Sequence, residues 1–172
     1  MKIKKLNIKK ISYEIMTTAI LVFVVSNIVS CIRQPQLDSN ILPKFKAELI
    51  DDRVINLNDI NQTTIVHFWA TWCPTCRLEA SNIESISKDV NVITVAVNSG
   101  SDREIQEFMK RNRLTFRVIN DNQSKLASSF KVEMFPTTFI YNKNRELKFS
   151  EVGYTSTAGL KARVLWIQKN KE

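Results

Sequence analysis

The chain has 172 residues, 44% of them hydrophobic, so we expect one folded domain with an appendage, and the composition excludes intrinsic disorder. The formal net charge is +8, but five of the positive charges are lysines that precede Glu14. From Gln34 onward, 19 Lys and Arg residues face 16 Asp and Glu residues, a balance of +3. This gives no electrostatic footprint for nucleic acid, and we expect no nucleic-acid partner.

A membrane-targeting segment is expected at the N-terminus. Residues 1–15 carry the five lysines and are expected to stay in the cytoplasm, because basic residues mark the cytoplasmic side of a membrane helix. Residues 16–32 contain no charge and are just long enough for a transmembrane helix. We interpret them as an uncleaved signal anchor in a bacterial inner membrane, which places the rest of the chain in the periplasm.

Two other fates of this segment remain open. The sequence IVSC, which ends at Cys31, resembles a bacterial lipoprotein box and makes Cys31 a candidate lipidation site. Cleavage would instead release a soluble protein, although no clear Ala-x-Ala site is present. Residues 33–41 are polar and contain a proline, so they are expected to form a linker, and residues 42–172 are expected to form the globular domain.

The rest of the chain alternates between strand and helix patterns. A strand–turn–strand element is expected at residues 45–50 and 54–57, and further strands at 64–70, 91–97, 116–119, 137–141 and 146–149. Helices are expected at residues 74–87, 102–113, 124–130 and 157–168. The inward stripes of the first and last helix are expected to be Leu78, Ile83 and Ile86, and Leu160, Val164 and Ile167. This order predicts an α/β fold with a central mixed sheet flanked by helices.

The sequence WCPTC, from Trp72 to Cys76, lies between a predicted buried strand and the next helix. The first N–H groups of that helix and the positive end of its dipole favour the thiolate of Cys73, which is the nucleophile in thiol–disulfide exchange. Cys76 lies one turn further on, close enough to form a disulfide and release a bound partner. Pro74 suits the first turn, where its missing N–H would have no partner.

Metal binding is the competing interpretation of this cysteine pair. A zinc site needs two more ligands, and the other candidates are Cys31 and the single histidine, His67, which lies on the preceding strand. Two thiolates also suit Cu(I), so a copper-binding metallochaperone is the alternative from another class, although no Met- or His-rich segment supports it. The three glycines are too few for a Gly-rich phosphate loop, and we expect no metal and no cofactor.

Two motifs resemble the thioredoxin superfamily: FWATWCPTC at residues 68–76 and FPTTF at residues 135–139. More narrowly, the chain resembles the membrane-anchored, periplasm-facing thiol–disulfide oxidoreductases of the TlpA/ResA type. Its closing stretch, VGYTS at residues 152–156 with Gly159, Leu160 and Trp166, looks closest to the suppressor-of-copper-sensitivity D proteins. The resemblance covers roughly residues 42–168 and implies a thioredoxin-like fold.

The resemblance implies roles for individual residues. Cys73 would attack the substrate disulfide, and Cys76 would resolve the mixed disulfide. Pro136 matches the cis-proline that the family places beside the cysteines, and the backbone of the preceding residue, Phe135, would pair with an extended substrate. The large Phe135 side chain would shape which substrates dock, while Trp72 would shield the pair and offer a contact surface.

Two ionisable residues carry open questions. His67 stands where thioredoxin itself has a buried acid, and it would either exchange a proton with Cys76 or serve as a hydrogen-bonded core histidine. Glu79 lies three residues after Cys76, where ResA-type proteins carry an active-site glutamate. Its carboxylate would raise the pKa of the thiols and accept a proton, and the alternative is an exposed helix charge.

The expected function is dithiol–disulfide exchange with periplasmic protein thiols and disulfides, in the direction of reduction. The electrons would come from another protein, and a transmembrane thiol reductase is the expected donor. A disulfide oxidase or isomerase is the alternative within the same class. A non-catalytic interaction module is the third possibility, and the intact cysteine pair argues against it.

Overall fold

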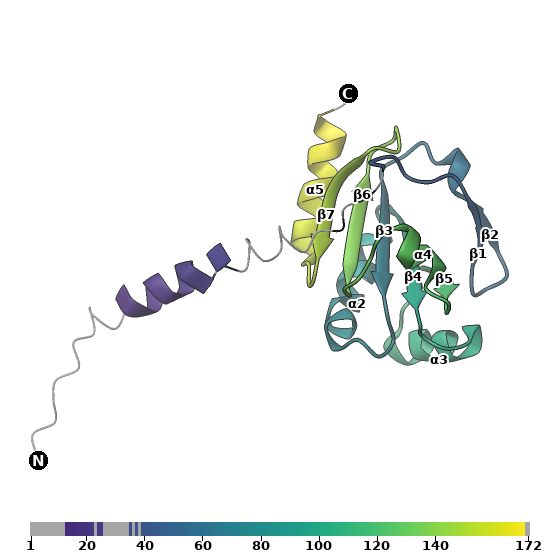
Figure 1. Cartoon of the computed structure of the whole chain (residues 1–172), viewed down its shortest axis with the longest axis horizontal. Helices are drawn as coiled ribbons and strands as arrows, with labels where there is room; N and C mark the ends of the chain where they lie inside the picture. The colour runs from purple at the N-terminus through teal and green to yellow at the C-terminus, as the bar shows by residue number, and fades with distance from the viewer. Residues whose placement is uncertain (1–12, 23, 26–34, 36, 38, 171–172) are drawn as a thin grey trace, which may run out of the picture. The chain divides into compact units, whose positions relative to one another are not determined.

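The computed structural model describes residues 13–22, 24–25, 35, 37 and 39–170 (Figure 1). The chain divides into two compact units, Met1–Gln34 and Pro35–Glu172. In the first unit, residues 13–22 and 24–25 are helical, and no helix in the described ranges is long and apolar enough to cross a membrane. Residues 26–32 of the expected anchor, with Cys31, lie outside the described residues, so the anchor and the lipidation site stay predictions.

A five-stranded mixed sheet forms the centre of the second unit, in the order β5-β4-β3-β6-β7 (Figure 1). Its strands are β3 (Thr64–Trp69), β4 (Asn91–Val97), β5 (Arg117–Asp121), β6 (Thr137–Tyr141) and β7 (Leu147–Val152). β4 runs parallel to β3 and β5 to β4, whereas β6 is antiparallel to β3 and β7 is antiparallel to β6. The predicted mixed sheet is confirmed, and β3 is its middle strand.

The helices of this unit lie close to their predicted positions. They are α2 (Pro74–Ile86), α3 (Asp102–Asn112), α4 (Lys125–Ser129) and α5 (Thr157–Lys169). α3 begins with a capping box in which Ser101 and Glu104 satisfy each other's backbone N–H groups. Its C-cap residue, Arg113, has a left-handed φ of 55°. Buried residues of α2, α3 and α5 pack on one face of the sheet, and α4 contributes to the cluster on the other face.

β3 is buried on both faces, as the mostly apolar run predicted. Because successive side chains of a strand point to opposite faces, Ile65 and Trp69 pack with the α2, α3 and α5 cluster. Val66 and Phe68 pack with the opposite cluster, where Phe68 stacks against Phe130 with ring centroids 5.1 Å apart. The strand that leads into the cysteine pair is therefore held between two apolar layers.

A separate two-stranded sheet precedes the central one. It pairs β1 (Lys46–Glu48) with β2 (Val54–Asn56), shorter strands than predicted, and the 3-10 helix η1 (Leu57–Asp59) follows. The preceding chain also makes sheet contacts, because the Asn40 carbonyl accepts a hydrogen bond of 2.6 Å from the Leu147 N–H, and Ile41 forms an isolated bridge with Glu146. The end of the expected linker is thus paired with the start of β7.

The buried face of α2 differs from the prediction at one position. Leu78 is 72% exposed, whereas Cys76, Glu79, Ile83 and Ile86 are buried. Glu79 takes the place on the buried face that was predicted for Leu78. A prediction based on apolar spacing places a carboxyl residue in solvent. Leu160, Val164 and Ile167 of α5 are buried, as predicted.

Two of the three leucine-sized side chains of α2, Ile83 and Leu78, provide a matched test of this packing. Ile83→Ala should lower the free energy of unfolding by about 2–5 kcal/mol, because it leaves a cavity at a fully buried position. Leu78→Ala should change it by no more than about 0.5 kcal/mol, because the side chain is already in solvent. Urea unfolding of the oxidised protein measures both, and equal losses would contradict the assigned helix face.

Candidate active site

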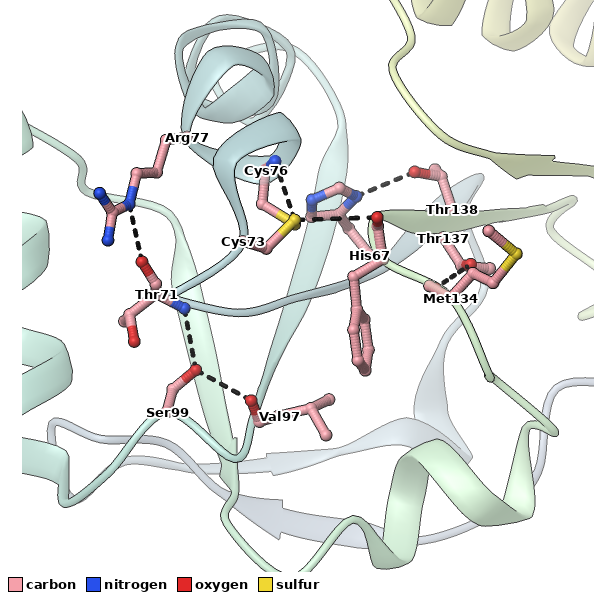
Figure 2. The surroundings of a disulfide bond; sticks show 11 residues. His67, Thr71, Cys73, Cys76, Arg77, Val97, Ser99, Met134, Thr137 and Thr138 are labelled. Carbon is pink, nitrogen blue, oxygen red and sulfur yellow. Dashed lines mark hydrogen bonds between the residues drawn. A yellow bond between two sulfur atoms is a disulfide. The ribbon is translucent and has the colours of Figure 1, made fainter.

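The two cysteines lie where β3 ends and α2 begins. Cys73 is the N-cap residue of α2, Pro74 occupies the first turn, and the pair is joined by a disulfide with the two Cα atoms 5.3 Å apart. The Cys76 N–H lies 3.2 Å from Cys73 Sγ (Figure 2). The first turn of the helix therefore directs an N–H donor at the sulfur on which the sequence predicts negative charge.

The second motif, which begins just before β6, also lies beside the cysteine pair. The Phe135–Pro136 peptide bond is cis, which confirms the expectation from the resemblance. Cys73 Sγ lies 3.7 Å from the carbonyl oxygen of Phe135, and the Phe135 ring packs edge-to-face on Trp72 with centroids 5.7 Å apart. The Gly153 N–H donates to the Pro136 carbonyl at 2.8 Å, so the chain after β7 contacts the proline.

The loop between β3 and Cys73 is fixed from outside the motif. The Thr71 N–H donates to Ser99 Oγ at 3.0 Å, and Trp72 Nε1 donates to the Asn98 carbonyl at 3.0 Å. From the other side, Arg77 Nε donates to the Thr71 carbonyl at 2.8 Å (Figure 2). Sequence analysis did not identify these three partners. A signal for two of them existed, because Asn98 and Ser99 directly follow β4, whose carboxyl end lies beside that of β3.

His67 is buried in the middle of β3. Its Nδ1 lies 2.9 Å from the Thr138 hydroxyl, which belongs to the paired residue on β6. It shares a sheet face with Ile65 and Trp69, which pack in the same cluster as both cysteines. Burial lowers the pKa of His67 to about 3, so the imidazole is neutral at physiological pH. The structure thus places a neutral, hydrogen-bonded histidine on the face that carries the cysteine pair.

Glu79 is fully buried, so the alternative of an exposed helix charge is wrong. It lies one turn after Cys76 on the inward face of α2, and its Oε1 accepts a hydrogen bond of 3.0 Å from the Thr155 N–H. Its Oε2 has no hydrogen-bond partner among the residues that the structure describes. Burial raises the pKa of Glu79 to about 8, and the hydrogen bond from Thr155 opposes that shift. The carboxyl group is therefore mostly protonated at neutral pH.

Large apolar side chains remain accessible near the pair. Trp72 is 54% exposed, and Met134, the residue before Phe135, is also exposed. Cys73 and Cys76 themselves are buried, so a partner must first contact this apolar rim. Within the part of the chain that the structure describes, no three His, Cys, Asp or Glu side chains gather in the way a metal ion requires.

Comparison with known proteins gives matches over the same region. The chain matches the AhpC/TSA family over residues 39–150. Sporulation thiol-disulfide oxidoreductase A of Bacillus subtilis strain 168 is 31% identical over 124 residues, which cover 68% of this chain and 75% of that protein. Thiol-disulfide oxidoreductase ResA of Oceanobacillus iheyensis is 26% identical over 157 residues, 81% of each chain. The crystal structure of StoA from Bacillus subtilis superposes with a TM-score of 0.64 at 26% identity, covering 72% of this chain and 98% of that one.

The buried Glu79 should make stability depend on pH in a defined direction. The unfolded chain releases the Glu79 proton near its ordinary pKa of 4.5, whereas the folded protein keeps it until about pH 8. Wild type therefore loses stability as pH rises through this window, and Glu79→Gln, which cannot ionise, does not. We expect the variant to gain on wild type as pH rises, with the gain levelling off above about pH 8.

Denaturant unfolding of the oxidised proteins at about pH 5, 7 and 8.5 measures this difference, and the disulfide keeps the thiols from titrating. Glu133→Gln, at an exposed position, is the matched control and should not reproduce the trend. A constant difference between Glu79→Gln and wild type across the range would show that Glu79 is ionised in the folded protein.

Proposed function

The chain belongs to the AhpC/TSA family and is a thioredoxin-like thiol–disulfide oxidoreductase, and from this premise we propose that it reduces protein disulfides in the periplasm. One observation carries the proposal. Cys73 Sγ lies at the N-terminus of α2 and is 3.7 Å from the carbonyl oxygen of Phe135. Phe135 precedes Pro136, and the peptide bond between them is cis. The attacking sulfur and a backbone edge for an extended substrate are thus side by side.

The reaction proceeds in two exchanges. In the reduced protein, the Cys73 thiolate attacks one sulfur of a substrate disulfide, which forms a mixed disulfide and releases the other substrate sulfur as a thiolate. The Cys76 thiolate then attacks Cys73 Sγ, which closes the internal disulfide and releases the second substrate thiol. Two electrons pass to the substrate, and the Cys76 N–H together with the helix dipole stabilises the Cys73 thiolate before attack.

The buried resolving cysteine needs a proton acceptor, and we assign this role to Glu79. It lies one turn from Cys76 on the same buried face, and within the described part of the chain its Oε2 has no hydrogen-bond partner. Its pKa of about 8 leaves a minority of the Glu79 carboxyl groups ionised at neutral pH, and this ionised form is the acceptor that we propose.

His67 is the weaker candidate for proton transfer. With a pKa of about 3, its imidazole cannot hold a second proton at neutral pH. Its hydrogen bond to Thr138, two residues after Pro136, favours a positioning role in which it fixes the start of β6 beside β3. Thr137 Oγ1 donates to the Met134 carbonyl at 2.7 Å and supports the same turn.

The periplasmic address rests on the sequence. The basic residues 1–15 and the uncharged residues 16–32 support a single-pass anchor whose N-terminus lies in the cytoplasm. Lipidation at Cys31 is the alternative means of attachment to the membrane. In the periplasm the Cys73–Cys76 disulfide must be reduced again after each exchange, and we propose a transmembrane thiol reductase as the electron donor. No metal or cofactor enters this scheme.

The redox potential of the pair tests the direction of electron flow. We expect a value below roughly −220 mV, near the thioredoxin end of the scale, in equilibrium with dithiothreitol and read by alkylation of free thiols. A value of about −180 mV or higher would place the protein with isomerases and oxidases and overturn the proposed direction.

Removal of the resolving cysteine tests the order of the two exchanges. Cys76→Ser should trap partner proteins on Cys73 as mixed disulfides, because the second attack is lost. The mixed disulfides should appear as bands of higher mass on non-reducing gels of cells that express the variant. Dithiothreitol should remove these bands, because it reduces the mixed disulfides. The double variant Cys73→Ser, Cys76→Ser is the control and should trap none. Equal trapping by both, or none by Cys76→Ser in cells where wild type functions, would contradict the mechanism.

A further inference from the structure

A polar cleft lies beside the active-site loop, on the α3 side. It has a volume of about 380 Å³, and the residues that line it include Thr71, Trp72, Arg77, Ser99 and Arg111. Thr71 and Trp72 immediately precede Cys73, Arg77 is on α2, Ser99 follows β4, and Arg111 is in the last turn of α3. Figure 2 shows Thr71 joined by hydrogen bonds to both Arg77 and Ser99.

The acidic residues of the cleft already have partners. Glu104 Oε2 accepts hydrogen bonds of 2.7 Å from both the N–H and the hydroxyl of Ser101. Glu107 Oε1 accepts a hydrogen bond of 3.1 Å from Arg103 Nε. Both carboxylates are therefore engaged within α3 and its cap.

Neither arginine of the cleft forms an ion pair with these two carboxylates among the described residues. Arg77 uses its Nε on the Thr71 carbonyl, which fixes the guanidinium and leaves its terminal N–H groups without a partner among the described residues. Arg111 is exposed, and its guanidinium forms no hydrogen bond or ion pair within the described part of the chain. A fixed guanidinium fork matches the geometry of a carboxylate, so the unpartnered terminal N–H groups of Arg77, together with Arg111 in the same cleft, suit an acidic group even with Glu104 and Glu107 in the lining.

The cleft is also within reach of a bound substrate. Because Thr71 and Trp72 are the two residues before Cys73, the cleft begins about 4–7 Å along the chain from the attacking residue. An extended substrate whose cysteine is bonded to Cys73 covers roughly 3–10 Å in its next one to three residues. A side chain at one of those positions can therefore enter the cleft.

We propose that this cleft selects protein substrates with an Asp or Glu side chain one to three residues from the cysteine that Cys73 attacks. The inference rests on the proposed disulfide exchange and adds a substrate preference to it. The carboxylate binds Arg77 and Arg111 in the mixed disulfide and in the encounter that precedes it. The preference is electrostatic, so it weakens as salt concentration rises.

Paired model peptides test this preference with the full chain purified in detergent. Each peptide contains one disulfide and carries either Asp or Asn at one of the three positions on either side of the attacked cysteine. We expect reduced wild type to react roughly two to six times faster with the Asp peptide for at least one position at low salt. Arg111→Glu should abolish or reverse that ratio.

Lys110→Glu is the matched control, because it makes the same charge change at the neighbouring exposed position of α3 without lining the cleft. It should keep the wild-type ratio, and all three proteins should reduce the Asn peptide at similar rates. An Asp-to-Asn ratio of one at every position in wild type would overturn the inference, as would equal ratios in Arg111→Glu and Lys110→Glu. Failure of wild type to reduce either peptide would instead refute the proposed exchange itself.

Discussion

The antiparallel pairing of β3 with β6 is the constraint on which the active site depends. Phe68 lies opposite Thr137 and His67 opposite Thr138, so the carboxyl end of β3 and the amino end of β6 lie together. This register carries the two motifs, 62 residues apart in sequence, to a separation of 3.7 Å between Cys73 Sγ and the Phe135 carbonyl. A slip of one residue would turn the β6 side chains to the opposite face and separate the motifs.

Burial gives the site its electrostatic character. Glu79 and His67 are both ionisable in water, but desolvation raises the pKa of the acid to about 8 and lowers that of the base to about 3. Both are predominantly neutral near pH 7, so the interior behind the cysteines carries little fixed charge. The oriented backbone N–H groups at the start of α2 add to the field at Cys73, and no count of charged residues records them.

Features governed by local patterning were predictable from sequence, and those governed by distant contacts were not. Alternation and apolar spacing located the strands, the helices and the junction that carries Cys73, and the resemblance supplied the cis bond before Pro136. Periodicity failed at Leu78 and Glu79, because a carboxyl group on an inward stripe depends on the Thr155 N–H, 76 residues away. The contacts of Asn98 and Ser99 likewise require the parallel β3–β4 register.

The way in which the loop is pinned has a consequence for divergence. Hydrogen bonds to Ser99 and Asn98 hold Thr71 and Trp72, and neither residue between the cysteines takes part in them. Pro74 is exposed and Thr75 only partly covered. The two positions that tune the acidity of the thiols most directly thus make none of the hydrogen bonds that hold the loop before Cys73. Related proteins with this scaffold can therefore differ in the reduction potential of the cysteine pair through substitutions at these two positions, without compensating changes elsewhere in the fold.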